Sequence, residues 1–70
     1  MTYAVGLFVE LLIQHWPILP EPTKALIRRD LEEEFERDDR HRAENPTGLW
    51  MPLGHDCDRA EWERVRALWK

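Results

Sequence analysis

The chain has 70 residues, a formal net charge of −4, four tryptophans and one cysteine. With 43% hydrophobic and 34% charged residues it is too apolar for intrinsic disorder, and its negative charge disfavours broad binding to nucleic acid. A lone cysteine cannot form an intramolecular disulfide, and so short a chain builds only one small core. We therefore expect oligomerisation to stabilise the fold.

The first predicted element is an apolar helix over about residues 3–16. Nine of the eleven residues from Tyr3 to Ile13 are apolar, and Pro17 stops a helix. A helix that is apolar on every side must be buried on every side, and the rest of the chain offers few apolar residues to cover it. We therefore expect a homodimer, with five residues of this helix in or beside its seam: Tyr3, Leu7, Phe8, Leu11 and Leu12.

The same apolar run must be compared with a membrane span and with a secretory signal. A span needs about 20 apolar residues, and this run is shorter and carries Glu10 in its middle. A secretory signal has a basic region before its apolar run, whereas uncharged Thr2 precedes Tyr3 here. We therefore expect a cytoplasmic protein that does not enter a membrane.

A proline-rich bend is predicted over residues 17–22, which hold three prolines. Proline fixes one backbone angle and removes an amide donor, so the bend should be stiff. We expect Ile18 and Leu19 to plug the core. A proline-rich docking ligand is the alternative, although the usual PxxP spacing fits only Pro17 to Pro20.

The second predicted helix covers about residues 23–43 and has a thin apolar face. After Phe35 the chain is charged without interruption from Glu36 to Arg42. Opposite charges four residues apart stabilise an isolated helix by about 0.2–0.5 kcal/mol per pair. We therefore expect this end of the helix to stand in water with no core beneath it. The apolar face consists of Leu26, Ile27, Leu31 and Phe35.

The charge on this helix is uneven, because residues 30–39 hold seven acidic residues and one basic residue, a net charge of −6. An acidic face that imitates the phosphates of a nucleic acid is one interpretation, but the arginines interrupt it, and a solvated helix face is favoured. Arginine is enriched at interface hot spots. We therefore predict the partner-binding surface at Arg37, Asp38, Arg40, His41 and Arg42, with Trp50 and Met51 as further contacts.

An apolar loop over residues 44–57 and a third helix over about residues 58–69 complete the chain. The loop is expected to cover the core or to contact a partner through Trp50 and Met51. Asp58 should cap the third helix, with Glu61 completing a capping box. The predicted fold is a single all-α domain, a helical hairpin with a short third helix. The core-facing residues of that helix are Trp62, Val65, Leu68 and Trp69.

The sequence contains no set of residues typical of a catalytic site. His55 and Cys57, with His15 and His41 elsewhere, could bind zinc, but structural zinc sites usually present paired ligands two to four residues apart. We therefore expect a non-enzymatic protein with no cofactor, no metal and no small-molecule substrate. A zinc-stabilised adaptor stays open as a third interpretation.

A small DNA-associated transcription regulator is the second interpretation. The last helix carries a net charge of +2 over residues 59–70 and could contact phosphates. However, Glu61 and Glu63 oppose phosphates, so we expect no nucleic acid as partner. The basic residues concerned are Arg59, Arg64, Arg66 and Lys70.

In general character the chain resembles the small proteins with which bacteriophages disable host machinery. It is short, acidic and rich in tryptophan and arginine, with an apolar helix, a charged helix and no catalytic set. Anti-CRISPR proteins and anti-activators belong to this broad group. The resemblance implies inhibition by occlusion of a larger host protein in the bacterial cytoplasm, such as a transcription regulator, a defence complex or a motor ATPase. It assigns no functional residue.

Overall fold

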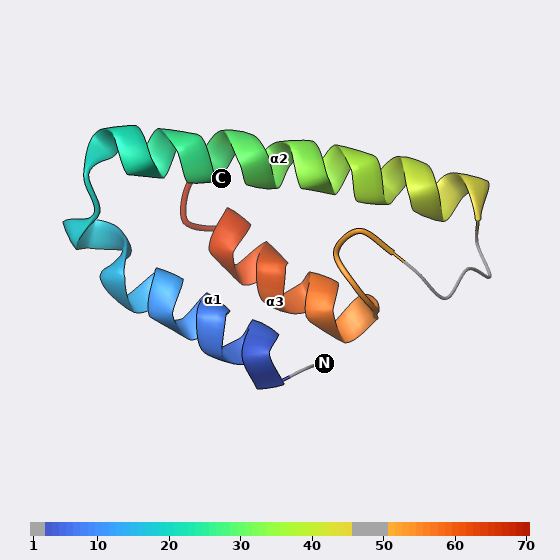
Figure 1. The fold of residues 1–70 in the computed structure, drawn as a ribbon, viewed down its shortest axis with the longest axis horizontal. Helices are drawn as coiled ribbons and strands as arrows, with labels where there is room; N and C mark the ends of the chain where they lie inside the picture. Colours follow the sequence, from blue (N-terminus) through green and yellow to red (C-terminus); the bar gives the residue numbers. More distant parts are fainter. Residues whose placement is uncertain (1–2, 46–50) are drawn as a thin grey trace.

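The chain folds into three α-helices (Figure 1) in a computed structural model that describes residues 3–45 and 51–70. The predicted all-α class is confirmed, and the described part of the chain forms no strand. No helix in that part is both long and apolar enough to cross a membrane. The three helices are α1 (Tyr3–His15), α2 (Glu21–Glu44) and α3 (Asp56–Arg66).

The connection between α1 and α2 is a short 3-10 turn, η1 (Trp16–Ile18), followed by an extended residue pair. Pro22 lies in the first turn of α2, where a missing amide donor costs nothing. The bend therefore follows from the prolines, as predicted. The expectation that Ile18 plugs the core is wrong, because its side chain is 76% exposed.

α3 lies between the other two helices (Figure 1). α1 packs mainly on α3, and α2 also packs on α3, whereas α1 and α2 have few direct contacts. The predicted hairpin is thus present as two arms joined by the bend, with the third helix between them.

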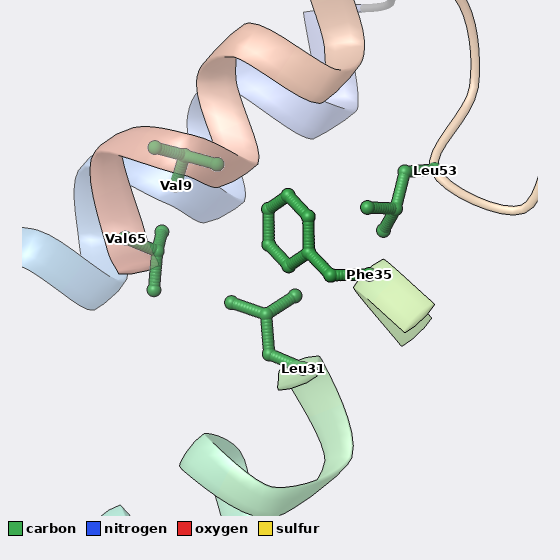
Figure 2. Packing of buried hydrophobic residues seen from close by; sticks show 5 residues of the cluster. All are labelled: Val9, Leu31, Phe35, Leu53 and Val65. Atoms are coloured by element: carbon green, nitrogen blue, oxygen red, sulfur yellow. The ribbon is translucent and has the colours of Figure 1, made fainter. Parts of the chain in front are cut away.

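The core is small and takes residues from all three helices and from the loop before α3 (Figure 2). The ring of Phe35 lies among the other four side chains, with the guanidinium groups of Arg59 and Arg66 5.1 and 4.5 Å from its centroid. Cations at this distance from an aromatic ring are attracted by its electrons. The five buried hydrophobic residues are Val9, Leu31, Phe35, Leu53 and Val65.

The start of α3 differs from the prediction. Its N-cap is His55, and Asp58 lies within the first turn, buried. The predicted capping box led by Asp58 is therefore wrong. Gly54 precedes this start with a φ of 79°, and a Cβ there would lie 2.6 Å from Asp58 Oδ2. Both the backbone angle and the close approach require glycine.

Candidate protein-binding surface

α1 presents a row of large apolar side chains to solvent, which we call the α1 stripe: Leu7, Phe8 and Leu11. Phe8 is 64% exposed, Leu7 49% and Leu11 46%. Their spacing of one, three and four residues places them on one side of the helix, while Val9 on the other side is fully buried. α1 is therefore a core helix on one side and an uncovered apolar helix on the other.

Two further residues were predicted in the same seam. Leu12 is partly buried against the core, so the structure separates it from the exposed residues of the stripe. Tyr3 is the first residue of α1. Of the predicted seam residues, Leu7, Phe8 and Leu11 are therefore exposed on one side of the helix, whereas Leu12 contacts the core.

The charge in the middle of α1 is neutralised within the chain. Glu10 Oε1 accepts a hydrogen bond from Arg64 Nη2 at 2.6 Å, and Arg64 Nη1 also donates to Glu61 at 2.8 Å. The nearby carboxylates raise the pKa of Arg64 above its ordinary value. Glu10 is the only charged residue from Tyr3 to Gln14. The α1 stripe consequently carries no net charge of its own.

A groove adjoins the α1 stripe. It encloses about 430 Å³ between α1, α2, α3 and the loop before α3. Leu12 is one turn beyond Phe8 on α1, so the stripe and the groove share an edge. The carboxylate residues Asp30 and Glu34 also line it. Its main apolar lining consists of Leu12, Leu26, Ile27, Leu31, Leu53 and Trp62.

Asp38 is the centre of an ion cluster that joins α2, α3 and the loop between them. Its side chain is fully buried and accepts hydrogen bonds from Arg42 Nε at 2.6 Å and from the Leu53 amide at 3.1 Å. Arg59 of α3 donates a third. We call Asp38, Arg42 and Arg59 the Asp38 cluster. It fastens the end of α2 to α3.

The hydrogen bonds of this cluster control the charge state of Asp38. Burial by itself would raise the pKa of the carboxyl group, but the hydrogen bonds from Arg42, the Leu53 amide and Arg59 outweigh it. The pKa of Asp38 is therefore lowered below the ordinary value for aspartate. The bond to Asp38 raises the pKa of Arg42. The cluster is consequently ionised and satisfied at neutral pH.

The expectation that the end of α2 packs against nothing is therefore wrong. Asp38 is buried, and Arg42 also donates to Asp56 at 2.7 Å and to the Gly54 carbonyl at 2.9 Å. Arg37 and Arg40 are exposed, with Arg37 paired to Glu34. The five predicted contact residues of α2 thus divide between an internal ion cluster and an outer face.

The remaining predicted contact residues lie at the outer face and in the loop. His41 is half-buried, and its carbonyl accepts the Asn45 amide at 2.8 Å. Met51 is half-buried, and its carbonyl closes a turn with Gly54 at 2.9 Å. Trp50 lies outside the described residues. His41 lies one turn beyond Arg37 on the same side of α2, whereas Met51 lies in the loop before α3.

A second ionic contact joins the end of the chain to the middle of α2. Arg66 binds Glu32 through two hydrogen bonds of 2.9 Å, and Trp69 Nε1 donates to the same carboxylate at 3.0 Å. These bonds from Arg66 and Trp69 lower the pKa of Glu32. Trp69 also lies against Trp16, with ring centroids 5.6 Å apart.

These contacts bear on the basic residues that could contact nucleic acid. Arg59, Arg64 and Arg66 are each within ion-pair distance of carboxylates, and Lys70 Nζ is 3.9 Å from Glu32. A phosphate would have to compete with these carboxylates. These ion pairs therefore count against the second interpretation, a small DNA-associated regulator.

His15 and His41 lie on α1 and α2, whereas His55 and Cys57 lie together at the start of α3. His15 ends α1, and its Nδ1 donates a hydrogen bond to the Leu11 carbonyl oxygen at 2.9 Å. Cys57 is exposed in the first turn of α3. Among residues 3–45 and 51–70, no three histidine, cysteine, aspartate or glutamate side chains converge in a way that could hold a metal ion.

Comparisons with protein-family models, with curated proteins and with solved structures gave no match. The chemistry of the surface therefore carries the functional argument.

The groove was missed at the sequence level, although the sequence holds a signal for it. Leu26 and Leu31 are five residues apart, so at about 100° per residue they point about 140° apart around the helix. Leu26 therefore cannot share the core face of Leu31 and Phe35, and it is 49% exposed. Treating all four apolar residues of α2 as one face concealed the second apolar surface.

Proposed function

We propose that this chain is a non-enzymatic protein-binding protein that self-associates through the α1 stripe and acts by covering the surface of a larger protein. The exposure of Leu7, Phe8 and Leu11 carries this proposal. Contiguous apolar surface is uncommon on soluble monomers and marks interaction sites. The described part of the chain offers no arrangement suited to metal chemistry, and its other conspicuous clusters are internal ion pairs.

A second copy is the occupant that best fits the α1 stripe. The stripe contains no charged side chain, and the neighbouring Glu10 is paired with Arg64. A two-fold axis brings the same patch of each chain together. Side chains three and four residues apart form the ridges that pack between two helices. An antiparallel pair of α1 helices would therefore cover the stripe of each chain with that of the other.

Covering a partner is also what the resemblance to small bacteriophage inhibitors implies. In that case the target would be a host transcription regulator, a defence complex or a motor ATPase in the bacterial cytoplasm. A protein of 8.5 kDa that binds such a target would act by occlusion. The groove beside the stripe supplies a separate apolar surface for this purpose.

Sedimentation equilibrium at micromolar concentration tests the self-association. The parent protein should have twice the mass of the 8.5 kDa chain, and the variant Leu7→Gln/Leu11→Gln should dissociate. Leu26→Gln, which changes an equally exposed leucine of α2, is the matched control and should stay dimeric. A parent that is folded by circular dichroism yet monomeric would overturn the proposed self-association.

A further inference from the structure

The groove is a mainly apolar surface shared by three helices and a loop. Two helices form its walls, with Leu12 on α1 and Leu26 on α2, and Trp62 of α3 contributes to its lining. The groove is open to solvent, so the apolar face of a partner helix can reach its lining. An amphipathic helix binds such a groove by inserting apolar side chains spaced three and four residues apart.

The charge beside the groove defines what kind of helix fits. Asp30 and Glu34, one turn apart on α2, are the charged residues that line it. Arg29 contacts Asp30 at 3.4 Å and Arg37 contacts Glu34, but all four side chains keep more than a third of their surface exposed, so both pairs are weak. Nearby on α2, Glu32 and Asp38 are held by arginines of α2 and α3, whereas Glu33 is exposed. A helix that lies here should carry basic residues beside its apolar face.

We infer that the groove binds an amphipathic, basic helix of another protein. This inference rests on the proposed function and names the partner class of its second surface. A second copy of the chain fits the groove less well, because its exposed apolar helix carries Glu10 and no lysine or arginine. The arginines of α3 in that copy are held by carboxylates.

The test uses synthetic helical peptides of about five turns, with leucine and phenylalanine at helical spacing on one face. One peptide carries lysine on the other face, a second carries glutamate there, and a third is a scrambled form of the lysine peptide. Fluorescence anisotropy at about 0.15 M salt measures binding to the full chain. The lysine peptide should bind at least tenfold more tightly than either of the others.

Two sets of variants place the peptide in the groove. Leu26→Gln should weaken the lysine peptide at least tenfold, and Asp30→Lys/Glu34→Lys should reverse the preference between lysine and glutamate peptides. Glu36→Lys/Glu44→Lys is the matched control, because both residues are exposed on α2 and neither lines the groove. It should keep the parent's preference. Circular dichroism checks that each variant is folded.

Three results would overturn the inference: no binding of the lysine peptide, equal binding by the parent and Leu26→Gln, or equal effects of the two charge-reversal pairs. Sedimentation of the same samples distinguishes a wrong assignment of the groove from a wrong proposal of self-association. A dimeric parent that binds no peptide overturns the groove assignment alone. A monomeric parent that binds the lysine peptide through Leu26 overturns the self-association alone.

Discussion

Asp38 and Arg42, one turn apart near the end of α2, form an ion pair of 2.6 Å in which the carboxylate is fully buried. Arg59 and the Leu53 amide complete the coordination of this carboxylate. A buried charge is tolerated only when it is paired and hydrogen-bonded. The pair therefore fixes where the loop and α3 dock on α2.

Removing the buried carboxylate should destabilise the fold strongly. Asp38→Ala leaves Arg42 and Arg59 without their shared partner, and breaking a buried ion pair costs about 3–5 kcal/mol. Urea unfolding followed by circular dichroism measures the loss. Asp39→Ala is the matched control, since Asp39 is 62% exposed and also contacts Arg59, at 2.7 Å. Asp39→Ala should lower the free energy of unfolding by no more than about 1 kcal/mol. Equal losses for the two variants would mean that the burial of Asp38 contributes nothing to stability.

Stability should decrease in acid, with a direction set by Asp38 and Glu32. The pKa of each is lower in the folded chain than its ordinary value, which is about 3.9 for aspartate and 4.3 for glutamate. Their contribution is therefore complete above these ordinary values and is lost as the pH falls through the folded values. Thermal melts at one protein concentration should be constant from about pH 7 to 5 and fall below about pH 4.

The variant Asp38→Asn tests whether Asp38 causes this loss of stability in acid. It cannot titrate, so its midpoint at neutral pH should be lower than the parent's and its further decrease below about pH 4 should be shallower. Other carboxylates will leave some decrease in both proteins. If the melting midpoints of the parent and of Asp38→Asn fall in parallel as the pH is lowered, Asp38 does not contribute to the loss of stability in acid.

Arg42 and Arg40 are close in sequence but should behave differently. Arg42 donates to Asp38, Asp56 and the Gly54 carbonyl, whereas Arg40 is exposed. Hydrogen bonds to charged groups contribute about 1.5–3 kcal/mol, so Arg42→Ala should lower the free energy of unfolding by about 2 kcal/mol. Arg40→Ala should change it by less than about 0.5 kcal/mol. Two equal values would contradict the docking role of Arg42.

The helices themselves could be predicted from the sequence. The apolar run ending at Pro17, the proline in the first turn of α2 and the spacing of Trp62 and Val65 are local signals, and the structure contains the corresponding helices and core contacts. The predicted end of the third helix near residue 69 is wrong, because α3 ends at Arg66 and Leu68 packs on the core from beyond it. Phe35 was expected to be the last core residue of α2, and it is the last buried hydrophobic residue there. Local spacing was sufficient for these features.

The Asp38 cluster could not be predicted, because its partners come from distant positions. Leu53 is 15 positions from Asp38 and Arg59 is 21 positions away, and both reach it only after the loop folds back. The charges of α2 were expected to pair along the helix. That expectation fits Asp38 with Arg42, but Glu32 pairs with Arg66 of α3 instead.

The seam on α1 was predicted on too broad a surface for a similar reason. Composition shows that the helix is apolar, but only the docking of α3 decides which side is covered. That docking buries Val9 and leaves Phe8 exposed. The α1 stripe is what the structure leaves for a partner, and a second copy remains the proposed occupant.

Site-directed cross-linking tests that occupant most directly. In a Cys57→Ser background, cysteine placed at Leu7 or at Leu11 keeps a small apolar side chain in the stripe, and cysteine at Glu33, exposed on α2, is the control. With a short bis-maleimide at micromolar protein, the two stripe positions should give covalent dimers rapidly and Glu33→Cys should not. Equal, slow cross-linking at all three positions, with the chains folded by circular dichroism, would contradict the proposed α1 seam.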